Sequence, residues 1–301
     1  MTDKTHAPPP LRDASTVILV REKNKAIEVY LLRRSTKSGF MGGLYVFPGG
    51  VVDAEDKGFD SWASHIDIPL DQIENQVGGD GFPTEDALGF SIAAIRETLE
   101  EAGVFLASGK DKTQKDLEDI CSVRLSENLP KSWFKTKITT ENWILSLSSL
   151  GRWSHWITPG LMKKRFDTRF FIVLMPENQI CVPDNMETKH GIWLTPQKAL
   201  EQNLKALTPL SPPAVVTLTQ MMRFKGLDDL KQEIQMRSWA DPIAPRLVPS
   251  SNGPVILEPW DPMCDDDCDI DTSNFSNRVL SPGAEFSRIW CDKGVWKPVG
   301  I

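Results

Sequence analysis

Residues 84–103 constrain the fold more than any other part of the sequence. Thr84 is a suitable N-cap, acidic residues follow it at the positive end of a helix, and Gly103 is suited to end that helix. Apolar residues recur at alternating spacings of four and three, at Leu88, Ile92, Ile95, Leu99 and Ala102. This period predicts an amphipathic helix whose continuous apolar face packs on a core.

The opposite face of this predicted helix carries Glu97, Glu100 and Glu101. At about 100° per residue, the three side chains point within roughly 100° of one another. Like charges at these spacings destabilise a helix slightly unless a cation compensates them. Mg²⁺ or Mn²⁺, which accept hard oxygen ligands, would suit such a cluster. The alternative is a solvated helix face with no ligand, and the three carboxylates alone do not decide between the two.

The residues before this helix predict strands and a glycine-rich loop. Two β-rich runs, 16–21 and 27–34, flank Asn24 and predict a hairpin. In residues 39–50, glycines surround the apolar run 44–47, which predicts a strand leading into a tight loop. Residues 53–83 are polar and broken by glycine and proline, so we expect an insertion, at about 57–83, that lies outside the core.

The residues after this helix predict mixed structure. We expect irregular helices over 111–150, strands at 166–175 and 191–194, a short helix from Pro196, helices over 212–239 with a break at 225–227, and a hairpin of 246–248 with 255–257. An acidic tail follows.

Charge and composition exclude several classes of protein. The net charge of −7 argues against the basic surface that binds nucleic acid polymers. No run approaches the roughly 20 apolar residues of a membrane span, and residues 1–15 form a polar leader. Five cysteines are an odd number for a disulfide framework, so we expect reduced thiols. Cys264 and Cys268 enclose three aspartates, a pattern more typical of an acidic surface loop than of a metal site.

Two motifs together resemble the signature of the Nudix hydrolase family. Residues 47–50 read Phe-Pro-Gly-Gly, and residues 96–104 follow R-E-x-x-E-E-x-G-V. In the family signature a glycine, five residues, a glutamate and seven residues precede the second motif. Here Asp56 takes the place of that glutamate, Thr98 replaces a hydrophobic residue, and 39 residues, 57–95, separate Asp56 from Arg96. The chain therefore looks like a Nudix protein whose signature is split by an insertion.

The resemblance extends over about residues 16–196. Residues 31–35, 40–43, 45–53, 93–98 and 165–171 are similar to the branch that includes the peroxisomal coenzyme A diphosphatases of animals and their bacterial relatives. The resemblance implies an α/β (α+β) fold, a Nudix-type α/β/α sandwich with a mixed sheet. We expect a leader at 1–15, the Nudix domain at 16–205, and a helical extension and tail at 206–301.

The resemblance also implies roles for individual residues. Glu100 and Glu101 would bind Mg²⁺ or Mn²⁺, and Glu97 would be a third ligand or the base that deprotonates water. The backbone carbonyl of Gly50 would be a further ligand, and Arg96 would orient Glu97. The glutamate that Asp56 replaces is usually structural in the family, so we do not expect this substitution to abolish catalysis.

Substrate-binding residues are harder to choose from the sequence. Arg33, Arg34, Arg165 and Arg169 would each suit a phosphate, or would simply be solvated strand residues. We select Arg34 and Arg169, and add Gly49, whose missing side chain allows a ligand to approach the backbone. His155 lies between tryptophans and is more typical of a packed histidine than of a catalytic one.

These features favour a cytoplasmic, metal-dependent hydrolase of a small nucleotide diphosphate, with coenzyme A or acyl-coenzyme A as the expected substrate. The same chemistry would serve ADP-ribose, NADH or a sugar nucleotide. A Nudix-fold binding module without catalysis is the alternative from another class, but Glu97, Glu100 and Glu101 are all retained. An interaction protein that uses the acidic tail rests on composition alone.

Overall fold

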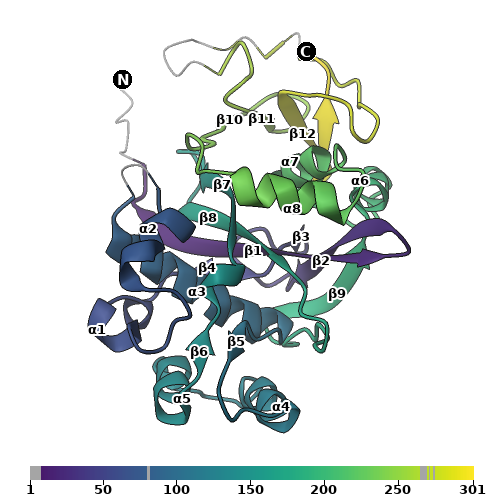
Figure 1. Ribbon diagram of the computed structural model, residues 1–301. Helices are drawn as coiled ribbons and strands as arrows, with labels where there is room; N and C mark the ends of the chain where they lie inside the picture. Colours follow the sequence, from purple (N-terminus) through teal and green to yellow (C-terminus); the bar gives the residue numbers. More distant parts are fainter. Residues whose placement is uncertain (1–7, 80–81, 265–269, 271, 274) are drawn as a thin grey trace.

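A mixed sheet of seven strands runs through the centre of the molecule (Figure 1). The computed structural model describes residues 8–79, 82–264, 270, 272–273 and 275–301. The strands of this sheet are β1 Leu11–Lys23, β2 Ala26–Arg34, β3 Tyr45–Val46, β4 Gly49–Val51, β7 Gly151–Ile157, β8 Arg165–Leu174 and β9 Thr188–Leu194. Their order is β3-β2-β1-β8-β7, with β4 also paired to β1 and β9 to β2. The β1–β8 pair is parallel and the other pairs are antiparallel, which confirms the predicted mixed sheet.

Strand β1 is buried on both faces. Val17 and Leu19 face one hydrophobic core, and Ile18 and Val20 face the other. A continuous apolar run is what a strand covered on both sides requires. The strand begins at Leu11, earlier than the domain start predicted at Thr16. The predicted hairpin to β2 is confirmed, with Asn24 in the left-handed conformation at its turn.

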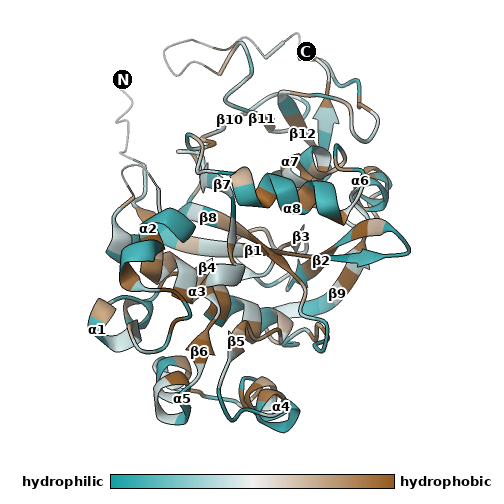
Figure 2. Cartoon of the chain, viewed as in Figure 1, coloured by the Kyte–Doolittle hydropathy of each residue, from teal (hydrophilic) through white to brown (hydrophobic). Residues whose placement is uncertain are grey.

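Helices cover both faces of the sheet, as the α/β/α expectation requires. On one face the main helix is α3 Thr84–Ala102, accompanied by α1 Phe59–Trp62, α2 Ile73–Gln76, α4 Gln114–Val123, α5 Trp133–Glu141 and the short pair β5 Ala107–Ser108 with β6 Ile144–Leu145. On the other face lie α6 Pro196–Leu204, α7 Pro212–Met221 and α8 Leu227–Met236. Three 3₁₀ turns complete the described elements: η1 Ala54–Asp56, η2 Leu70–Gln72 and η3 Leu147–Ser149. Figure 2 shows hydrophobic residues along β1 and β6, and hydrophilic residues on α2.

The apolar face predicted for α3 is confirmed. All five of its predicted apolar positions, from Leu88 to Ala102, are fully buried. Gly103 ends the helix with a φ of 69°, a left-handed conformation that glycine adopts without strain. At the other end Pro83, not Thr84, is the N-cap residue.

The segment predicted as an insertion outside the core is in fact part of it. Trp62, Ile73 and Val77 have no exposed surface and belong to the same core as α3. Trp62 and Ile73 lie in α1 and α2, and Val77 directly follows α2; these helices have only four residues each, too few for their apolar spacing to form a recognisable period. This part of the prediction was therefore wrong.

A second sheet near the C-terminus replaces the predicted acidic tail. It consists of β10 Arg246–Val248, β11 Val255–Leu257, β12 Arg288–Asp292 and β13 Val295–Val299, all antiparallel. The β10–β11 hairpin was predicted, but β12 and β13 were not. Their turn has positive φ at Lys293 and Gly294, which is the signature of a two-residue hairpin loop. Cys268 and its three neighbouring aspartates lie outside the described residues.

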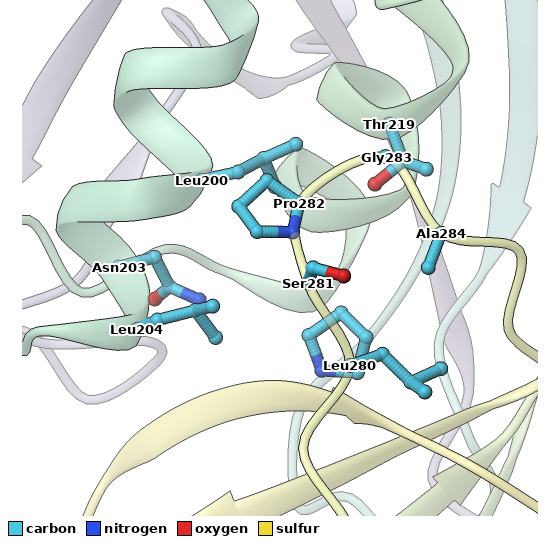
Figure 3. Close-up of a pocket in the computed structure, with 10 residues that line it drawn as sticks. Leu200, Asn203, Leu204, Thr219, Leu280, Ser281, Pro282, Gly283 and Ala284 are labelled. Carbon is cyan, nitrogen blue, oxygen red and sulfur yellow. The ribbon is translucent and has the colours of Figure 1, made fainter.

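Two of the hollows lined by the described residues differ greatly in size. The smaller lies between α6, α7 and residues 280–284, with Leu200 and Pro282 beside it (Figure 3). Its volume of about 10 Å³ is close to the minimum for a single water.

Within the described ranges, no helix combines the length and apolar character needed to span a bilayer.

Candidate active site

The larger hollow is a cavity of about 810 Å³ at the junction of α3 and the central sheet. Its wall includes Arg96, Glu97 and Glu100 from α3, and Gly49 and Gly50 from β4. Other lining residues come from β1, β7, β8, α7 and the C-terminal sheet. The volume lies within the range of pockets that enclose a small organic ligand.

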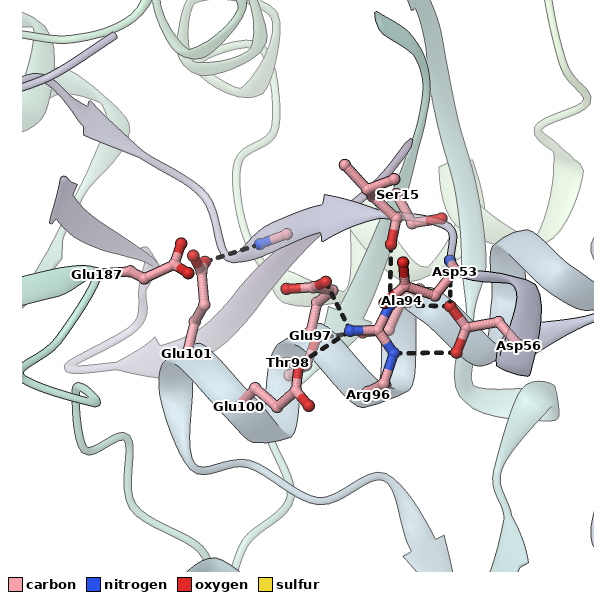
Figure 4. A network of polar contacts seen from close by, with 12 residues as sticks. Ser15, Asp53, Asp56, Ala94, Arg96, Glu97, Thr98, Glu100, Glu101 and Glu187 are labelled. Carbon is pink, nitrogen blue, oxygen red and sulfur yellow. Dashed lines mark hydrogen bonds and ion pairs between the residues drawn. The ribbon is translucent and has the colours of Figure 1, made fainter. Parts of the chain in front are cut away.

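The two halves of the split motif meet beside this cavity through Arg96 and Asp56 (Figure 4). Arg96 Nε donates to Asp56 Oδ1 at 2.9 Å, and Nη2 donates to Asp56 Oδ2 at 2.8 Å. Nη2 also donates to the carbonyl oxygen of Val51 at 2.8 Å. Only 1% of Asp56 is exposed, so this bidentate ion pair is buried and sensitive to the loss of either partner. Asp56, which is shorter than the glutamate of the family signature, thus makes a structural contact with Arg96, although the two residues are 40 positions apart in the sequence.

The remaining nitrogen of Arg96 contacts the catalytic candidates. Nη1 donates to Glu97 Oε1 at 2.7 Å and to Glu100 Oε2 at 2.9 Å. Trp133 Nε1, from α5, donates to the other oxygen of Glu100 at 2.7 Å. Glu97 and Glu100 are therefore held by a guanidinium that Asp56 in turn positions.

Glu101 points in another direction, toward β4 and Glu187 (Figure 4). Its Oε2 accepts a hydrogen bond from the backbone N–H of Gly49 at 2.9 Å. In the part of the chain that the structure describes, no three acidic, histidine or cysteine side chains converge as a metal site requires. The three glutamates share one helix face, as predicted, but they do not meet at one point.

This face is not the solvated surface of an amphipathic helix. The side chains of Glu97 and Glu100 are 14% and 28% exposed, and Glu101 is 4% exposed. Burial raises the pKa of Glu97 to about 7, although the charge of Arg96 opposes this effect. Burial also raises the pKa of Glu100, and burial together with the charge of Glu97 raises that of Glu101 well above its usual range. A cation bound beside these carboxylates would favour their charged forms and oppose this rise in pKa.

Gly49 and Gly50 bring the backbone of β4 against these carboxylates. A side chain on Gly50 would overlap the Glu97 carboxylate, and one on Gly49 would overlap the backbone of β1 at Ser15 and Thr16. Glycine at position 49 therefore allows β4 to lie against β1, and glycine at position 50 leaves room for the Glu97 carboxylate.

The predicted substrate-binding arginines separate into two groups. Arg34 lines the cavity, with Nη2 3.9 Å from Glu187 Oε2. Arg169 does not line it. In β8, Phe166, Thr168 and Phe170 face the cavity, so the alternation of the strand turns Arg169 to the opposite face. There its guanidinium lies 4.2 Å from the ring centre of Phe82 and 5.1 Å from that of Trp239.

The other weighed residues have local partners. Arg165 donates to the carbonyl oxygens of Thr158 and Pro9, and Arg33 donates to that of Gly43. His155 Nε2 lies 2.7 Å from Asp167 Oδ1, and only 8% of the histidine is exposed. The interpretation of His155 as a packed residue agrees with this position.

Three residues of this region were not selected from the sequence. Arg12 and Lys164 line the cavity, but Arg12 lay within the predicted leader. Trp133 lies in a segment that was read only as irregular helix. No spacing rule links Trp133 to Glu100, because the contact joins two separate helices.

Comparisons with known proteins bear on the family and the fold of this chain. The sequence profile described as the NUDT19 Nudix domain matches residues 63–221, more than half of the chain. Two similar proteins are named acyl-coenzyme A diphosphatase NUDT19. The one from Xenopus laevis is 28% identical and the match covers 81% of this chain and 73% of that protein. The one from Homo sapiens is 27% identical, with 88% and 81% covered.

A solved structure supports the fold. The crystal structure of a NUDIX hydrolase from Alicyclobacillus acidocaldarius superposes with a TM-score of 0.56 at 21% identity, over 76% of this chain and 99% of that one. The profile match ends at residue 221, within α7, and so extends past the domain end predicted at 205.

Proposed function

This chain belongs to the NUDT19 Nudix domain family, and from that premise we propose that it hydrolyses the diphosphate linkage of coenzyme A or an acyl-coenzyme A with the help of a divalent metal ion. In this reaction a water oxygen bonds to one phosphorus as the bridging P–O bond breaks. The products are 3′,5′-adenosine diphosphate and phosphopantetheine, or its acyl derivative. The names of the Xenopus laevis and Homo sapiens relatives support this choice of substrate.

The observation that carries the proposal is the position of Glu97 and Glu100 in the wall of an 810 Å³ cavity. Both carboxylates have a raised pKa, and both are held by Arg96. What favours an enzyme is that these carboxylates lie in a cavity wall and are held in place by Arg96, because positioned carboxylates beside a ligand cavity can bind a catalytic cation or accept a proton from water.

Glu97 has the properties of a general base. Burial raises the pKa of this carboxylate, and its place in the cavity wall would let it accept a proton from water. Arg96 fixes its position through the 2.7 Å hydrogen bond, and Asp56 fixes Arg96. We assign Glu97 to proton transfer or to metal binding, and Arg96 to positioning.

The donor set fits a divalent ion. Glu97, Glu100 and Glu101 offer hard carboxylate oxygens on one helix face, and the glycine backbone of β4 lies against Glu97, where the Gly50 carbonyl oxygen is a further candidate ligand. A bound Mg²⁺ or Mn²⁺ would neutralise the clustered charge and lower the pKa of an attacking water. To bind a single ion the carboxylates must turn toward one another, because they do not converge among the described residues.

Arg34 and Gly49 are the proposed contacts to substrate. Arg34 lies in the cavity wall close to Glu187 and near enough to Glu101 to oppose the rise of its pKa. A guanidinium at this position would pair with a phosphate oxygen. Arg12 and Lys164 are further cationic residues in the same wall.

The test is product-resolved turnover of coenzyme A, an acyl-coenzyme A, ADP-ribose, NADH and a sugar nucleotide, each with Mg²⁺, Mn²⁺ or EDTA. We expect coenzyme A or its acyl derivative to be cleaved, only with metal, and we expect Glu100→Gln to reduce turnover at least about 100-fold. Glu118→Gln, on the exposed side of α4, is the matched control and retains full activity.

Each contrary result has a definite meaning. Preferred cleavage of ADP-ribose, NADH or the sugar nucleotide would retain the enzyme class and reject the substrate. Binding of coenzyme A without any metal-dependent cleavage would reject hydrolysis in favour of a binding module. The cytoplasmic location stays a prediction, to be checked by imaging the tagged protein in its own cells.

A further inference from the structure

The charged and the uncharged residues of the cavity wall come from different parts of the sequence. Every charged residue that lines it lies between Arg12 and Glu187. The residues contributed by the chain beyond α6 are uncharged, and they include Pro212, Pro245, Leu247, Ile256 and Trp296. The part of the wall that α7 and the C-terminal sheet contribute is therefore uncharged, and we call it the uncharged portion of the cavity; the glutamates lie in the part that α3 contributes.

A row of aromatic side chains connects these two parts of the wall. Phe47, two residues before Gly49, packs against Phe170 with ring centres 6.5 Å apart. Phe170 packs against Trp156 at 6.2 Å. Trp156 in turn pairs through its backbone with Ile243, just before β10. Apolar surface thus runs from the glycines of β4 to the C-terminal sheet.

Coenzyme A likewise has a charged arm and an uncharged arm. Its use as the substrate here rests on the proposed function. The diphosphate lies in the middle of coenzyme A. One arm is a nucleotide with a charged 3′-phosphate, and the other is an uncharged pantetheine that can carry an acyl chain. A phosphate dianion surrounded by proline, leucine and tryptophan would lose its hydration without a partner, whereas an acyl chain there would leave water favourably.

We propose that the uncharged portion of the cavity binds the acyl end of the pantetheine arm, and that Leu247, Ile256 and Trp296 determine which acyl chains are accepted. The C-terminal sheet is then a specificity element of the enzyme. Leu247 is the best position to test this, because it is only half-buried and a change there disturbs the core less than one at Ile256.

The experiment compares kcat/KM for decanoyl-coenzyme A and for coenzyme A, and the reported quantity is the ratio of the two. Each methylene transferred from water strengthens binding by up to about fourfold, so we expect this ratio to be at least about 10 in the unmodified protein. Leu247→Trp, which fills the space, should lower the ratio at least about fivefold, and Leu247→Ala by about twofold to fourfold. Leu207, 67% exposed and outside the cavity wall, provides the matched control variants Leu207→Trp and Leu207→Ala, which should keep the ratio.

The outcomes separate this inference from the proposed function. Equal kcat/KM for both substrates, or a ratio that Leu247→Trp leaves within about twofold, would overturn the acyl assignment while hydrolysis stands. If neither substrate is cleaved, the proposed function fails, and the same ratio is measured from dissociation constants by calorimetric titration. Tighter binding of decanoyl-coenzyme A that is lost in Leu247→Trp would support the acyl site even then, and equal binding would overturn it. Leu247→Ala decides the result if Leu247→Trp does not fold.

Discussion

The candidate active site and the C-terminal sheet contain nearly the same buried ion pair. In the first, Arg96 binds Asp56 through Nε and Nη2 at 2.9 and 2.8 Å. In the second, Arg288 binds Asp261 through Nε and Nη2 at 2.8 and 3.2 Å. Each region also holds a buried glutamate with a raised pKa: burial brings Glu97 to about 7 and Glu258 to about 8.

The two regions differ in what the arginine and the glutamate contact. Arg96 continues to Glu97 and Glu100 in the cavity wall, whereas Arg288 lies over the ring of Phe275, 4.6 Å from its centre. Glu258 is fully buried, its oxygens have no hydrogen-bond partner among the described residues, and it does not line the cavity. A buried arginine–aspartate pair, or a shifted glutamate pKa, is therefore not sufficient to identify a site. The connection of both to a cavity is what distinguishes the first region.

The sharpest test of this difference compares Glu97→Gln with Glu258→Gln. Removing a general base should lower kcat by about 10²- to 10⁴-fold, so Glu97→Gln should lose nearly all turnover. Glu258→Gln should retain the kcat of the unmodified protein. Steady-state turnover, normalised to folded protein, measures both. A large loss of kcat in Glu258→Gln would break the distinction between the two regions.

The next test removes the aspartate of each ion pair. Asp261→Asn leaves Arg288 buried with no carboxylate partner in the described part of the chain, so the free energy of unfolding should fall by about 3–5 kcal/mol. Asp56→Asn leaves Arg96 with Glu97 and Glu100, so stability should fall less, by about 1–3 kcal/mol.

Urea denaturation measures both stabilities, and turnover provides the second readout. Asp56→Asn should reduce kcat because Arg96 loses the partner that orients it, whereas Asp261→Asn should not reduce the kcat of the folded fraction. Equal effects of the two substitutions on kcat would contradict the assignment of Arg96 as a positioning residue.

A third test uses the pH dependence of stability at Glu258. Its pKa is raised from 4.5 to about 8 by burial, so between these values the unfolded chain is ionised while the folded protein keeps its proton. The free energy of unfolding should therefore fall as pH rises, by up to about 1.4 kcal/mol per pH unit from this group. Urea denaturation at pH 5, 6.5 and 8 should show Glu258→Gln gaining stability relative to the unmodified protein at the higher values. If the difference in unfolding free energy between Glu258→Gln and the unmodified protein does not change with pH, Glu258 ionises readily in the folded protein.

The smallest expected effect concerns the indole that holds Glu100. Trp133→Phe removes the Nε1–H that donates to Glu100 and should lower kcat by about twofold to tenfold. Trp143→Phe is the matched control, because Trp143 Nε1 donates to Glu141 at 3.1 Å, outside the cavity wall. The two variants should lose similar stability in thermal denaturation, and only Trp133→Phe should lose turnover. Equal kcat values for Trp133→Phe and Trp143→Phe would mean that Trp133 contributes to packing and not to turnover.

Local pattern was sufficient for much of the fold. The apolar period of α3, the glycine that ends it and the Asn24 turn were read correctly because each depends on residues within one element. The same reasoning placed Glu97, Glu100 and Glu101 on one face. It could not tell that this face is buried, because burial depends on β4 and α5, which other parts of the chain supply.

The errors have different causes. Strand alternation puts Arg169 on the face of β8 opposite Phe170, but nothing in the strand itself states which face meets the cavity. Trp62 and Ile73 were assigned to an insertion outside the core because helices of one turn carry no period. The β12–β13 hairpin was missed, although Lys293 and Gly294 offered a turn signal.

The sequence by itself determined the family, the carboxylate helix and the chemistry that its three glutamates make available. The tertiary structure decided that Asp56 meets Arg96 across 40 positions, that Arg34 and not Arg169 lines the cavity, and that the C-terminal sheet completes its wall. Period and spacing report the direction of side chains within one helix or strand. Contacts between elements depend on how those elements pack, and packing is settled by the whole core at once.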